Sequence, residues 1–219
     1  MKRENRKHLC FAMCMLGAFL LWTAAIQIID VQAIGPQGST VGFAMVNQFV
    51  HRLTGVHLSV YALTDWLSLV PLGIMMGFGL LGLIQWIRRK HLLKVDYSIL
   101  VLGGFYVAVM AVFVFFELFV VNYRPVLIDG NLEASYPSST TMLVMCVMPT
   151  AMLQWNDRIQ NRLLKRWVLS ASAAFTVFMV LGRLLSGVHW VTDIVGGALL
   201  SAGLVILYQF VIGLEKKSS

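Results

Sequence analysis

Hydrophobic residues form six long runs along the chain, separated by short polar segments. The runs cover residues 9–29, 64–86, 97–121, 139–155, 167–186 and 190–212. A helix needs about 20 apolar residues to cross a bilayer, and each run is close to that length. The runs are too long and too apolar for barrel strands, which alternate apolar and polar positions. The pattern therefore predicts an all-α, polytopic membrane protein with six transmembrane helices in one bundle.

The segment between the first two runs, residues 30–63, has a different pattern. It opens with Gly35-Pro36-Gln37-Gly38-Ser39, which is a turn signal. Apolar residues between Val41 and Leu53 then alternate with polar ones at helical spacing. This spacing predicts a short helix that lies at the membrane interface. It either packs against the bundle or covers a site as a lid, and simple packing is the preferred interpretation.

Composition agrees with a membrane domain. The chain has 219 residues, of which 58% are hydrophobic and 12% are charged. A soluble domain would carry roughly a quarter charged residues. No internal repeat and no soluble second domain is visible, so residues 1–219 are expected to form one domain. The net charge of +7 does not indicate nucleic-acid binding, because the basic residues lie in short clusters between apolar runs.

These basic clusters predict the orientation. They are Lys2, Arg3, Arg6 and Lys7 before the first run; Arg88, Arg89, Lys90 and Lys94 after the second; Arg158, Arg162, Lys165 and Arg166 after the fourth; and Lys216 and Lys217 at the end. Six spans place all four clusters on one side, which the positive-inside rule makes cytoplasmic. Both termini are therefore expected in the cytoplasm. The compact six-span form suits a bacterial plasma membrane.

Three polar stretches fall on the opposite, outer side. They are Asn122–Pro125 after the third run, Tyr136–Thr141 at the start of the fourth, and Gly182–Asp193 between the fifth and sixth. Sequence order alone does not require these stretches to share a side of the membrane. Ionisable residues at a membrane edge are costly and are usually functional. The outer side is therefore the expected place for chemistry.

The three stretches together supply the residues of an anion site. Arg124 and Arg183 supply two permanent positive charges that match phosphate geometry. Ser138 follows a proline and fits the N-cap of the fourth span. Helix N-termini attract anions through their free N–H groups and the helix dipole. The hydroxyl groups of Ser138, Ser139 and Thr140 add further donors.

The third stretch adds a nucleophile. His189 precedes Asp193 by four residues, so the two would share a face of a helix. The aspartate can accept a hydrogen bond from one ring nitrogen and leave the other nitrogen free to attack. Together with Arg183, these residues predict a phosphate-binding site with a histidine nucleophile.

At these residues the chain resembles the type-2 phosphatidic acid phosphatase family of membrane lipid phosphatases. The family pattern reads K-x6-R-P, then P-S-G-H, then S-R-x5-H-x3-D. The matching residues are Arg124 and Pro125 in the first motif, Pro137 and Ser138 in the second, and Arg183, His189 and Asp193 in the third, with Gly182 in place of its serine. The resemblance covers the six-span layout and therefore essentially the whole chain.

The resemblance implies roles for these residues. His189 would attack phosphorus and form a phosphohistidine that water then cleaves, and Asp193 would orient His189. Arg124, Arg183 and Ser138 would hold the phosphoryl oxygens, together with the amides of Ser139 and Thr140. The substrate would be a lipid phosphate at the outer face, and the reaction would need neither a metal ion nor a cofactor.

Two positions depart from the family pattern. Glu117 stands where the family has lysine, and Thr140 stands where the family has the histidine that protonates the leaving oxygen. A threonine hydroxyl is too weak an acid for that role near neutral pH, and loss of a general acid costs about 10²–10⁴-fold in rate. A phosphate leaving group needs no proton. We therefore expect a lipid diphosphate, such as a polyprenyl diphosphate, to be preferred over phosphatidic acid.

Several residues are candidate modulators of the site. His51 and His57 share the outer side with His189, and Asp129 and Glu133 lie in an outer loop. Any of these groups could supply the missing proton. Glu117 is expected to form an ion pair with Arg124 or Arg183, because a buried charge is costly without a partner.

Three other functions remain open at this stage. A phosphotransferase would pass the phosphoryl group from the same site to another acceptor. A non-catalytic relative would bind an anionic lipid, although binding requires no activated histidine. A transporter is the least favoured, because no repeated halves are visible. The oligomeric state is not predicted by the sequence.

Overall fold

The computed structural model describes residues 3–215, and the side chains of residues 5–214. Eight α-helices lie within this part of the chain, together with two short 3-10 helices. They are α1 (Arg3–Ile28), α2 (Ala44–Thr54), α3 (Leu58–Leu67), α4 (Leu69–Arg89), α5 (Tyr97–Leu118), α6 (Ser139–Arg158), α7 (Arg162–Leu185) and α8 (Val191–Glu215). The all-helical class predicted from the sequence is confirmed for the described residues.

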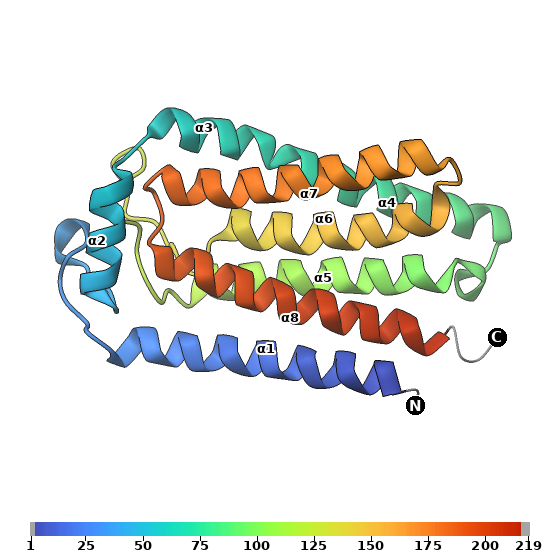
Figure 1. Ribbon diagram of the computed structural model, residues 1–219, viewed down its shortest axis with the longest axis horizontal. Coiled ribbons are helices and arrows are strands. Elements are labelled where there is room, and N and C mark those ends of the chain that lie inside the picture. The colour runs from blue at the N-terminus through green and yellow to red at the C-terminus, as the bar shows by residue number, and fades with distance from the viewer. Residues whose placement is uncertain (1–2, 216–219) are drawn as a thin grey trace.

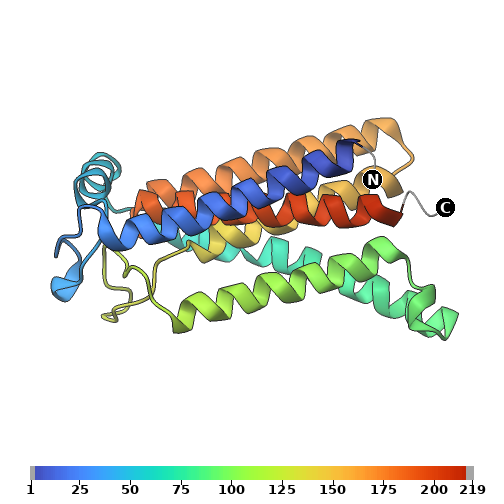
Figure 2. The same ribbon diagram turned by 90° about the horizontal axis from the view of Figure 1, so that it is seen from below.

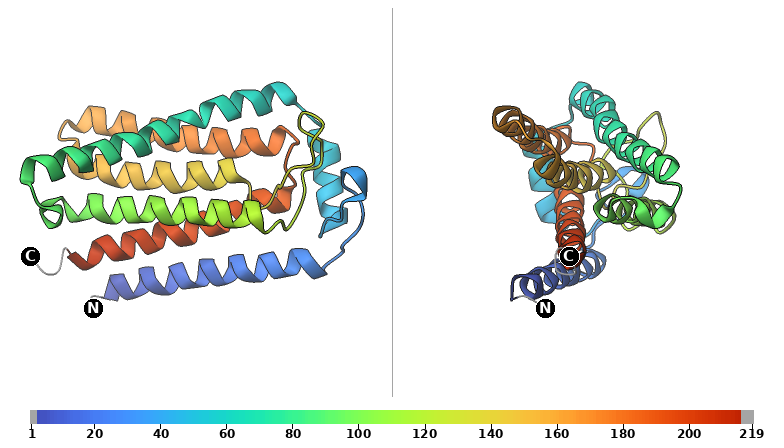
Figure 3. Two further views of the ribbon diagram at one scale, coloured as in Figure 1. Left: turned by 180° about the vertical axis from the view of Figure 1, so that it is seen from behind. Right: turned by 90° about the vertical axis from the view of Figure 1, so that its right-hand side faces the viewer.

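The long helices run side by side in a bundle, and α2 crosses one end of it (Figure 1). The loops from α4 to α5 and from α6 to α7 lie at the other end, where α1 begins and α8 ends (Figure 3). The basic segments predicted to share one side therefore do so, except for Lys2, Lys216 and Lys217, which lie outside the described residues. Which side faces the cytoplasm remains a prediction.

The central helix is α6, which lies between α7, α8, α4 and α5 (Figures 1 and 3). Thr140, Thr141, Thr150 and Gln154 of this helix are all buried. A helix surrounded by other helices can carry such polar residues, because its neighbours supply partners and lipid does not touch it. The hydroxyl of Thr150, for example, donates to the carbonyl oxygen of Cys146 at 2.7 Å.

Five helical segments of the described chain are long and apolar enough to cross a membrane. They are Asn5–Ile28, Leu58–Arg89, Tyr97–Leu118, Arg162–Leu185 and Val191–Leu214. The missing sixth is α6, which was expected to span at 139–155 and whose polar residues make it less apolar than the others. The composition of the helices thus supports a multi-pass membrane protein, and the count of six spans remains a prediction.

The second span differs most from expectation. It begins at Leu58 instead of residue 64, and α3 continues into α4 with a break at Ser68. The 32 residues of this segment would extend over about 48 Å at 1.5 Å per residue, whereas the hydrocarbon layer is about 30 Å thick. The extra length carries α3 towards the end of the bundle where α2 lies (Figure 1).

The short helix α2 agrees with the expected helix in residues 30–63. The preceding turn is also present, as a 3-10 turn at Pro36–Gly38. Asn47 anchors α2 to the bundle, because its amide nitrogen donates to the hydroxyl of Thr192 at 3.0 Å. Met45, Phe49 and Leu53 of α2 are exposed. The packing interpretation is therefore the better one for the face of α2 that carries Asn47.

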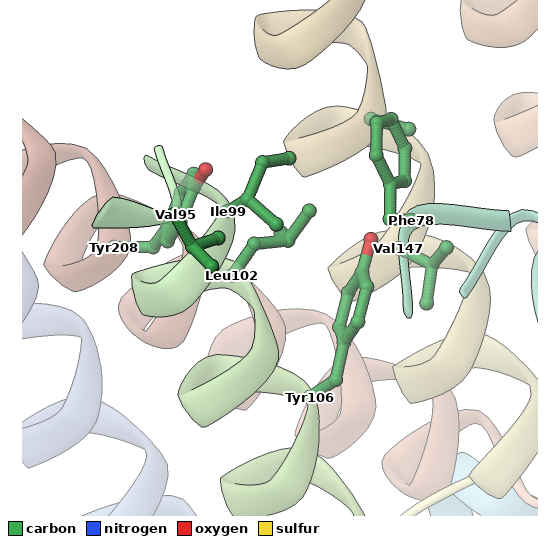
Figure 4. Packing of buried hydrophobic residues seen from close by; sticks show 8 residues of the cluster. Phe78, Val95, Ile99, Leu102, Tyr106, Val147 and Tyr208 are labelled. Atoms are coloured by element: carbon green, nitrogen blue, oxygen red, sulfur yellow. The ribbon is translucent and has the colours of Figure 1, made fainter. Parts of the chain in front are cut away.

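A hydrophobic cluster packs the helices against one another in the half of the bundle away from α2. Its buried members include Phe78 of α4, Leu102 and Tyr106 of α5, Val147 of α6 and Tyr208 of α8 (Figure 4). A second cluster, which contains Phe19, Val109, Tyr136, Met142 and Leu200, lies closer to α2 and unites α1, α5, α6 and α8. Tyr136 ends this cluster with a hydrogen bond to the hydroxyl of Thr23 at 2.7 Å.

Candidate active site

A short hairpin between α5 and α6 brings the first part of the site into place. Its turn is Asp129-Gly130, and both residues have positive φ, at 49° and 80°. Such Asp-Gly pairs favour the two-residue turn that joins antiparallel strands. The flanking residues Ile128 and Asn131 exchange two backbone hydrogen bonds, at 3.1 and 2.9 Å. The hairpin therefore returns the chain to the start of α6.

The returning arm places Ser135 between the two residues of the expected catalytic pair. The Oγ atom of Ser135 lies 3.1 Å from Nδ1 of His189, and its hydroxyl also donates to Oδ2 of Asp193. His189 and Asp193 themselves are 3.9 Å apart, which is too far for a direct hydrogen bond. All three residues are buried. The expected direct contact between histidine and aspartate is thus wrong, and a serine hydroxyl connects them.

The reason lies in where α8 begins. Its first residue is Val191, so His189 precedes the helix and does not share a helical face with Asp193. Asp193 instead lies in the first turn, where Oδ2 accepts from the backbone N–H of Trp190 at 2.9 Å. This is the reciprocal contact of a capping box, which fixes the start of a helix. Its Oδ1 accepts from the side-chain amide of Asn122 at 3.3 Å.

The sequence analysis missed Ser135 and the role of Asn122. Neither belongs to a recognisable motif, but the Asp129-Gly130 pair between apolar residues is a usable hairpin signal. In the hairpin, the backbone N–H of Ser135 donates to the carbonyl oxygen of Asn122 at 2.9 Å. A hairpin prediction would therefore have placed both residues near the first and second motifs.

Arg124 and Arg183 come together as expected, and both are buried. Nε of Arg124 lies 3.1 Å from Oε2 of Glu133, without the alignment of a hydrogen bond. The ring of Tyr61 contacts both guanidinium groups, with its centroid 5.7 Å from Cζ of Arg124 and 4.8 Å from Cζ of Arg183. An aromatic face attracts cations, so Tyr61 stabilises two charges that repel each other.

Helix α3 contributes Tyr61 and two further residues that sequence reasoning did not assign to the site. The hydroxyl of Thr64 accepts a hydrogen bond from Nη1 of Arg183 at 3.3 Å. Oδ1 of Asp65 lies 3.9 Å from Nη1 of Arg183. Gly182 permits this approach, since a Cβ atom there would lie 2.7 Å from the methyl group of Thr64. The departure from serine at this position thus has a packing reason.

The start of α6 faces the arginines. Ser138 occupies the N-cap position, but its hydroxyl caps no backbone N–H. Its own N–H donates to the carbonyl oxygen of Asp193 at 3.1 Å, which ties α6 to α8. Ser139 and Thr140 open the helix, whose first N–H groups have no acceptors within the helix. A helix N-terminus with free N–H groups is therefore present where it was expected, but Ser138 does not act as its side-chain cap.

Several buried polar atoms at this site have no hydrogen-bond partner among the described residues. They are Nε and Nη1 of Arg124, Nε of Arg183, Oγ of Ser138 and Nε2 of His189. Buried polar groups in native proteins are almost always satisfied, so such a concentration requires an explanation. Arginine has only donors, and phosphate oxygens are acceptors that match it. A phosphoryl group held among these atoms would satisfy the arginine donors and the Ser138 hydroxyl.

A cavity of about 280 Å³ reaches this group from the side of the bundle. Its polar end contains Asp65, Arg124, Thr140 and Arg183, and Ser139 also lines it. The apolar walls come from α4, α5 and α6 and include Leu72, Val109, Met110, Phe113 and Leu143. His189 does not line this cavity but a small crevice that shares Phe113, Ser139 and Met142 with it. The cavity thus suits a molecule with a charged head and a hydrophobic chain.

Three of the candidate modulators, Glu117, His51 and His57, do not reach the centre of the site. Glu117 is exposed in the last turn of α5 and makes no ion pair among the described residues, so the expected pairing with an arginine is wrong. His57 bonds to the carbonyl oxygen of Thr54 at 2.9 Å. His51 bonds to the carbonyl oxygen of Gly187 at 3.1 Å, and it thereby supports the turn that carries His189.

Electrostatics favour the neutral form of His189. Burial lowers the pKa of this imidazole well below its ordinary value, and the positive charges of Arg124 and Arg183 lower the pKa further. The hydrogen bond with Ser135 acts in the opposite direction but is weaker. The ring is therefore neutral at neutral pH. A neutral imidazole that donates from Nδ1 to Ser135 keeps the lone pair of Nε2 available for attack.

Within the described part of the chain, no group of three His, Cys, Asp or Glu residues is arranged to hold a metal ion. The positive charge at this site comes from Arg124, Arg183 and the N-terminus of α6.

Comparisons with known proteins support the fold. No protein-family model and no curated sequence matches the chain. Among solved structures, the chain is similar to a transmembrane PAP2-type phosphatidylglycerolphosphate phosphatase from Bacillus subtilis. The TM-score is 0.55 at 20% sequence identity, over 95% of this chain and 97% of the other. This chain has the fold of a PAP2-type membrane phosphatase, as the sequence motifs implied.

Inorganic phosphate is expected to bind the purified protein and raise its apparent melting temperature, because a ligand of the folded state stabilises it. Arg124→Gln removes charge-assisted hydrogen bonds worth about 1.5–3 kcal/mol, which corresponds to a Kd about ten- to a hundredfold higher. Thermal shift titrations at constant ionic strength measure the phosphate Kd of the wild type and of Arg124→Gln. Arg52→Gln on the exposed side of α2 is the matched control. Equal phosphate affinity in Arg124→Gln and the wild type would contradict the assignment.

Proposed function

We propose that this protein is a membrane lipid phosphatase that hydrolyses a lipid phosphate or diphosphate through a phosphohistidine. One observation supports this most strongly. An apolar cavity between helices ends at Arg124 and Arg183, whose charges are close enough to the buried His189 to lower its pKa, and Nε2 of His189 has no hydrogen-bond partner among the described residues. A hydrophobic chain in the cavity would place its phosphate among donors and within reach of a nucleophile. The PAP2-type fold supports the same reaction class.

In the proposed reaction, Nε2 of His189 attacks phosphorus and the leaving group departs on the opposite side. The hydrogen bonds from Nδ1 to Ser135 and from Ser135 to Asp193 orient the ring. They also stabilise the positive charge that develops on the imidazole, because Asp193 lies only 3.9 Å away. Water then attacks the phosphohistidine and releases inorganic phosphate.

The phosphoryl oxygens would be held by the two arginines and by the start of α6. Arg124 and Arg183 neutralise charge, Ser138 contributes its unpartnered hydroxyl, and the amides of Ser139 and Thr140 donate along the helix axis. Donors fixed in advance around the transferring group are the main source of catalysis in phosphoryl transfer. The proposed reaction needs no metal ion, and it is expected to continue in the presence of a chelator.

The leaving group determines which lipid is preferred. Thr140 lines the cavity where the family would have a proton-donating histidine, and its hydroxyl cannot replace that acid. A diphosphate leaves as a lipid phosphate and needs no proton. We therefore propose lipid diphosphates as preferred substrates over simple phosphate monoesters.

A second cavity could hold the far part of a long hydrocarbon chain, which favours a long-chain lipid as the substrate. It has a volume of about 630 Å³ and lies between α4 and α5, where Gly79, Gly82, Gly103 and Gly104 leave space. It begins about one helical turn beyond the first cavity, at Met75 on α4 and Tyr106 on α5. A chain longer than the first cavity would continue into this space. We propose that the protein acts in this way on a lipid in a plasma membrane, at the outer face.

The orientation of His189 favours catalysis over a purely lipid-binding role. Binding of an anionic lipid would be served by Arg124 and Arg183 alone. A neutral histidine in a buried, positively charged site, held by Ser135 and Asp193, adds nothing to affinity and supplies a nucleophile. A phosphotransferase would use the same residues with an acceptor other than water.

His189→Ala is expected to abolish phosphate release, because the proposed reaction has no other nucleophile. Purified protein in detergent with a chelator would be given phosphatidic acid and a polyprenyl diphosphate in parallel. The wild type is expected to release phosphate from both lipids and to prefer the diphosphate. His57→Ala, a histidine outside the site, serves as the control. Undiminished release by His189→Ala would disprove the proposal, and a clear preference for phosphatidic acid would disprove the leaving-group argument.

The charge of Arg124 should be visible in the pH dependence of kcat/KM. His189 is active when neutral, so kcat/KM falls as the pH drops through its pKa. Arg124 lowers this pKa, so Arg124→Gln raises it. The acid-side decline of kcat/KM is therefore expected at higher pH in Arg124→Gln than in the wild type or Arg52→Gln. Ionisation of the substrate affects all three proteins equally, so it cannot cause a difference between their pH profiles. Declines that coincide, or a shift to lower pH, would contradict the role of His189.

A further inference from the structure

Asp65 is the one carboxylate that lines the cavity leading to the arginines. Its side chain is 59% exposed, and its Oδ1 atom lies 3.9 Å from Nη1 of Arg183. It is presented by α3, the part of the second span that extends towards the site end of the bundle. No motif of the sequence includes Asp65, and the reaction described above does not use it.

Asp65 and the proposed nucleophile, His189, line two different spaces at the site. His189 lines the narrow crevice, whereas Asp65, Arg124, Thr140 and Arg183 line the cavity. Phe113, Ser139 and Met142 line both, so the crevice and the cavity adjoin at the start of α6. In phosphoryl transfer the attacking and leaving atoms are roughly in line through phosphorus. If the lipid chain lies in the cavity and His189 attacks from the crevice, the leaving oxygen departs on the side of the cavity, which Asp65 lines.

The other carboxylates near the site are placed differently. Glu117 lines the crevice together with His189, which is the side of the nucleophile. Glu133 lies 3.1 Å from Arg124 but does not line the cavity. Thr140 does line it, at the position where the family has a histidine, but a hydroxyl is a poor acid and a poor base near neutral pH.

We propose that Asp65 carries the proton on the leaving-group side of the reaction. This inference rests on the proposed function. A phosphate monoester in its monoanionic form brings one proton with it, because the second pKa of a phosphate is about 6. The Asp65 carboxylate takes this proton from the phosphoryl oxygen and gives it to the ester oxygen as the P–O bond breaks and the His189–P bond forms. The products are a neutral lipid alcohol and a phosphohistidine, and Asp65 is again a carboxylate.

In the second step, Asp65 acts on the water that attacks the phosphohistidine. Water enters the position that the alcohol has left and attacks phosphorus opposite His189. Asp65 accepts one proton from this water as the new P–O bond forms and the His189–P bond breaks, and it passes the proton to the departing phosphate. Arg183 keeps Asp65 beside the reacting atoms in both steps.

With a lipid diphosphate as substrate, the two steps differ in their need for Asp65. Its leaving group is a phosphate that departs without a proton, so the first step does not need Asp65. Only the attack of water on the phosphohistidine then depends on it. Asp65 therefore gives the chain its activity on monoesters, in spite of Thr140, and governs turnover with diphosphates.

Asp65→Asn tests this, because asparagine keeps the shape of the side chain but cannot accept a proton. The full-length protein would be given phosphatidic acid and a polyprenyl diphosphate, and both the first turnover and the steady state would be measured. With phosphatidic acid, kcat is expected to fall about 10²–10⁴-fold, the usual effect of a general acid or base. With the diphosphate, one equivalent of lipid phosphate is expected at nearly the wild-type rate, followed by slow turnover.

Asp129→Asn is the matched control, because it makes the same change at an exposed carboxylate in the hairpin turn that does not line the cavity. Asp65→Glu should restore most of the activity on phosphatidic acid. Equal rates in Asp65→Asn and Asp129→Asn would overturn the inference. A first turnover with the diphosphate that is lost as fully as kcat would also overturn it, since Asp65 would then only position Arg183. Failure of the wild type to release phosphate from either lipid would refute the proposed function itself, and the inference with it.

Discussion

Two buried guanidinium groups, those of Arg124 and Arg183, determine much of the architecture at one end of this bundle. Like charges at close range repel strongly where water is scarce, and burial adds a further cost. The protein offsets this cost with the ring of Tyr61 against both groups and with Glu133 and Asp65 beside them. Several donors of the arginines still have no partner, so the site favours an anion that can accept from both. Burial and the same two charges lower the pKa of His189 and keep its ring neutral.

The bundle brings four separate segments to this point. Helix α3 lengthens the second span and carries Tyr61 and Asp65. A tight hairpin reverses the chain and brings Ser135 towards α6. The turn before α8 holds His189 outside the helix, and the first turn of α8 holds Asp193. Hydrogen bonds between these segments run through buried polar atoms, such as Ser138 to Asp193. The geometry of the proposed nucleophile is thus a property of the packed helix ends and not of one motif.

The sequence predicted the helices and the charged residues of the site well, because both leave strong local signals. Long apolar runs define spans, and arginine, histidine and aspartate at a membrane edge are rare enough to attract notice. Ser135, Tyr61 and Thr64 were missed because their roles depend on chain reversals and on which helices touch. Spacing placed His189 on a helix with Asp193, but the helix starts two residues later, and Ser135 fills the gap.

The central claim is that His189 becomes covalently phosphorylated. The most direct measurement is rapid quenching of the wild-type protein with a lipid substrate, followed by mapping of the phosphorylated residue by mass spectrometry under alkaline conditions. The account predicts a phosphoryl group on His189 that is stable in base, is lost in acid and forms fast enough to be on the pathway. Phosphate release at a normal rate with no phosphorylated His189 at any quench time would show that water attacks the lipid directly, and would contradict it.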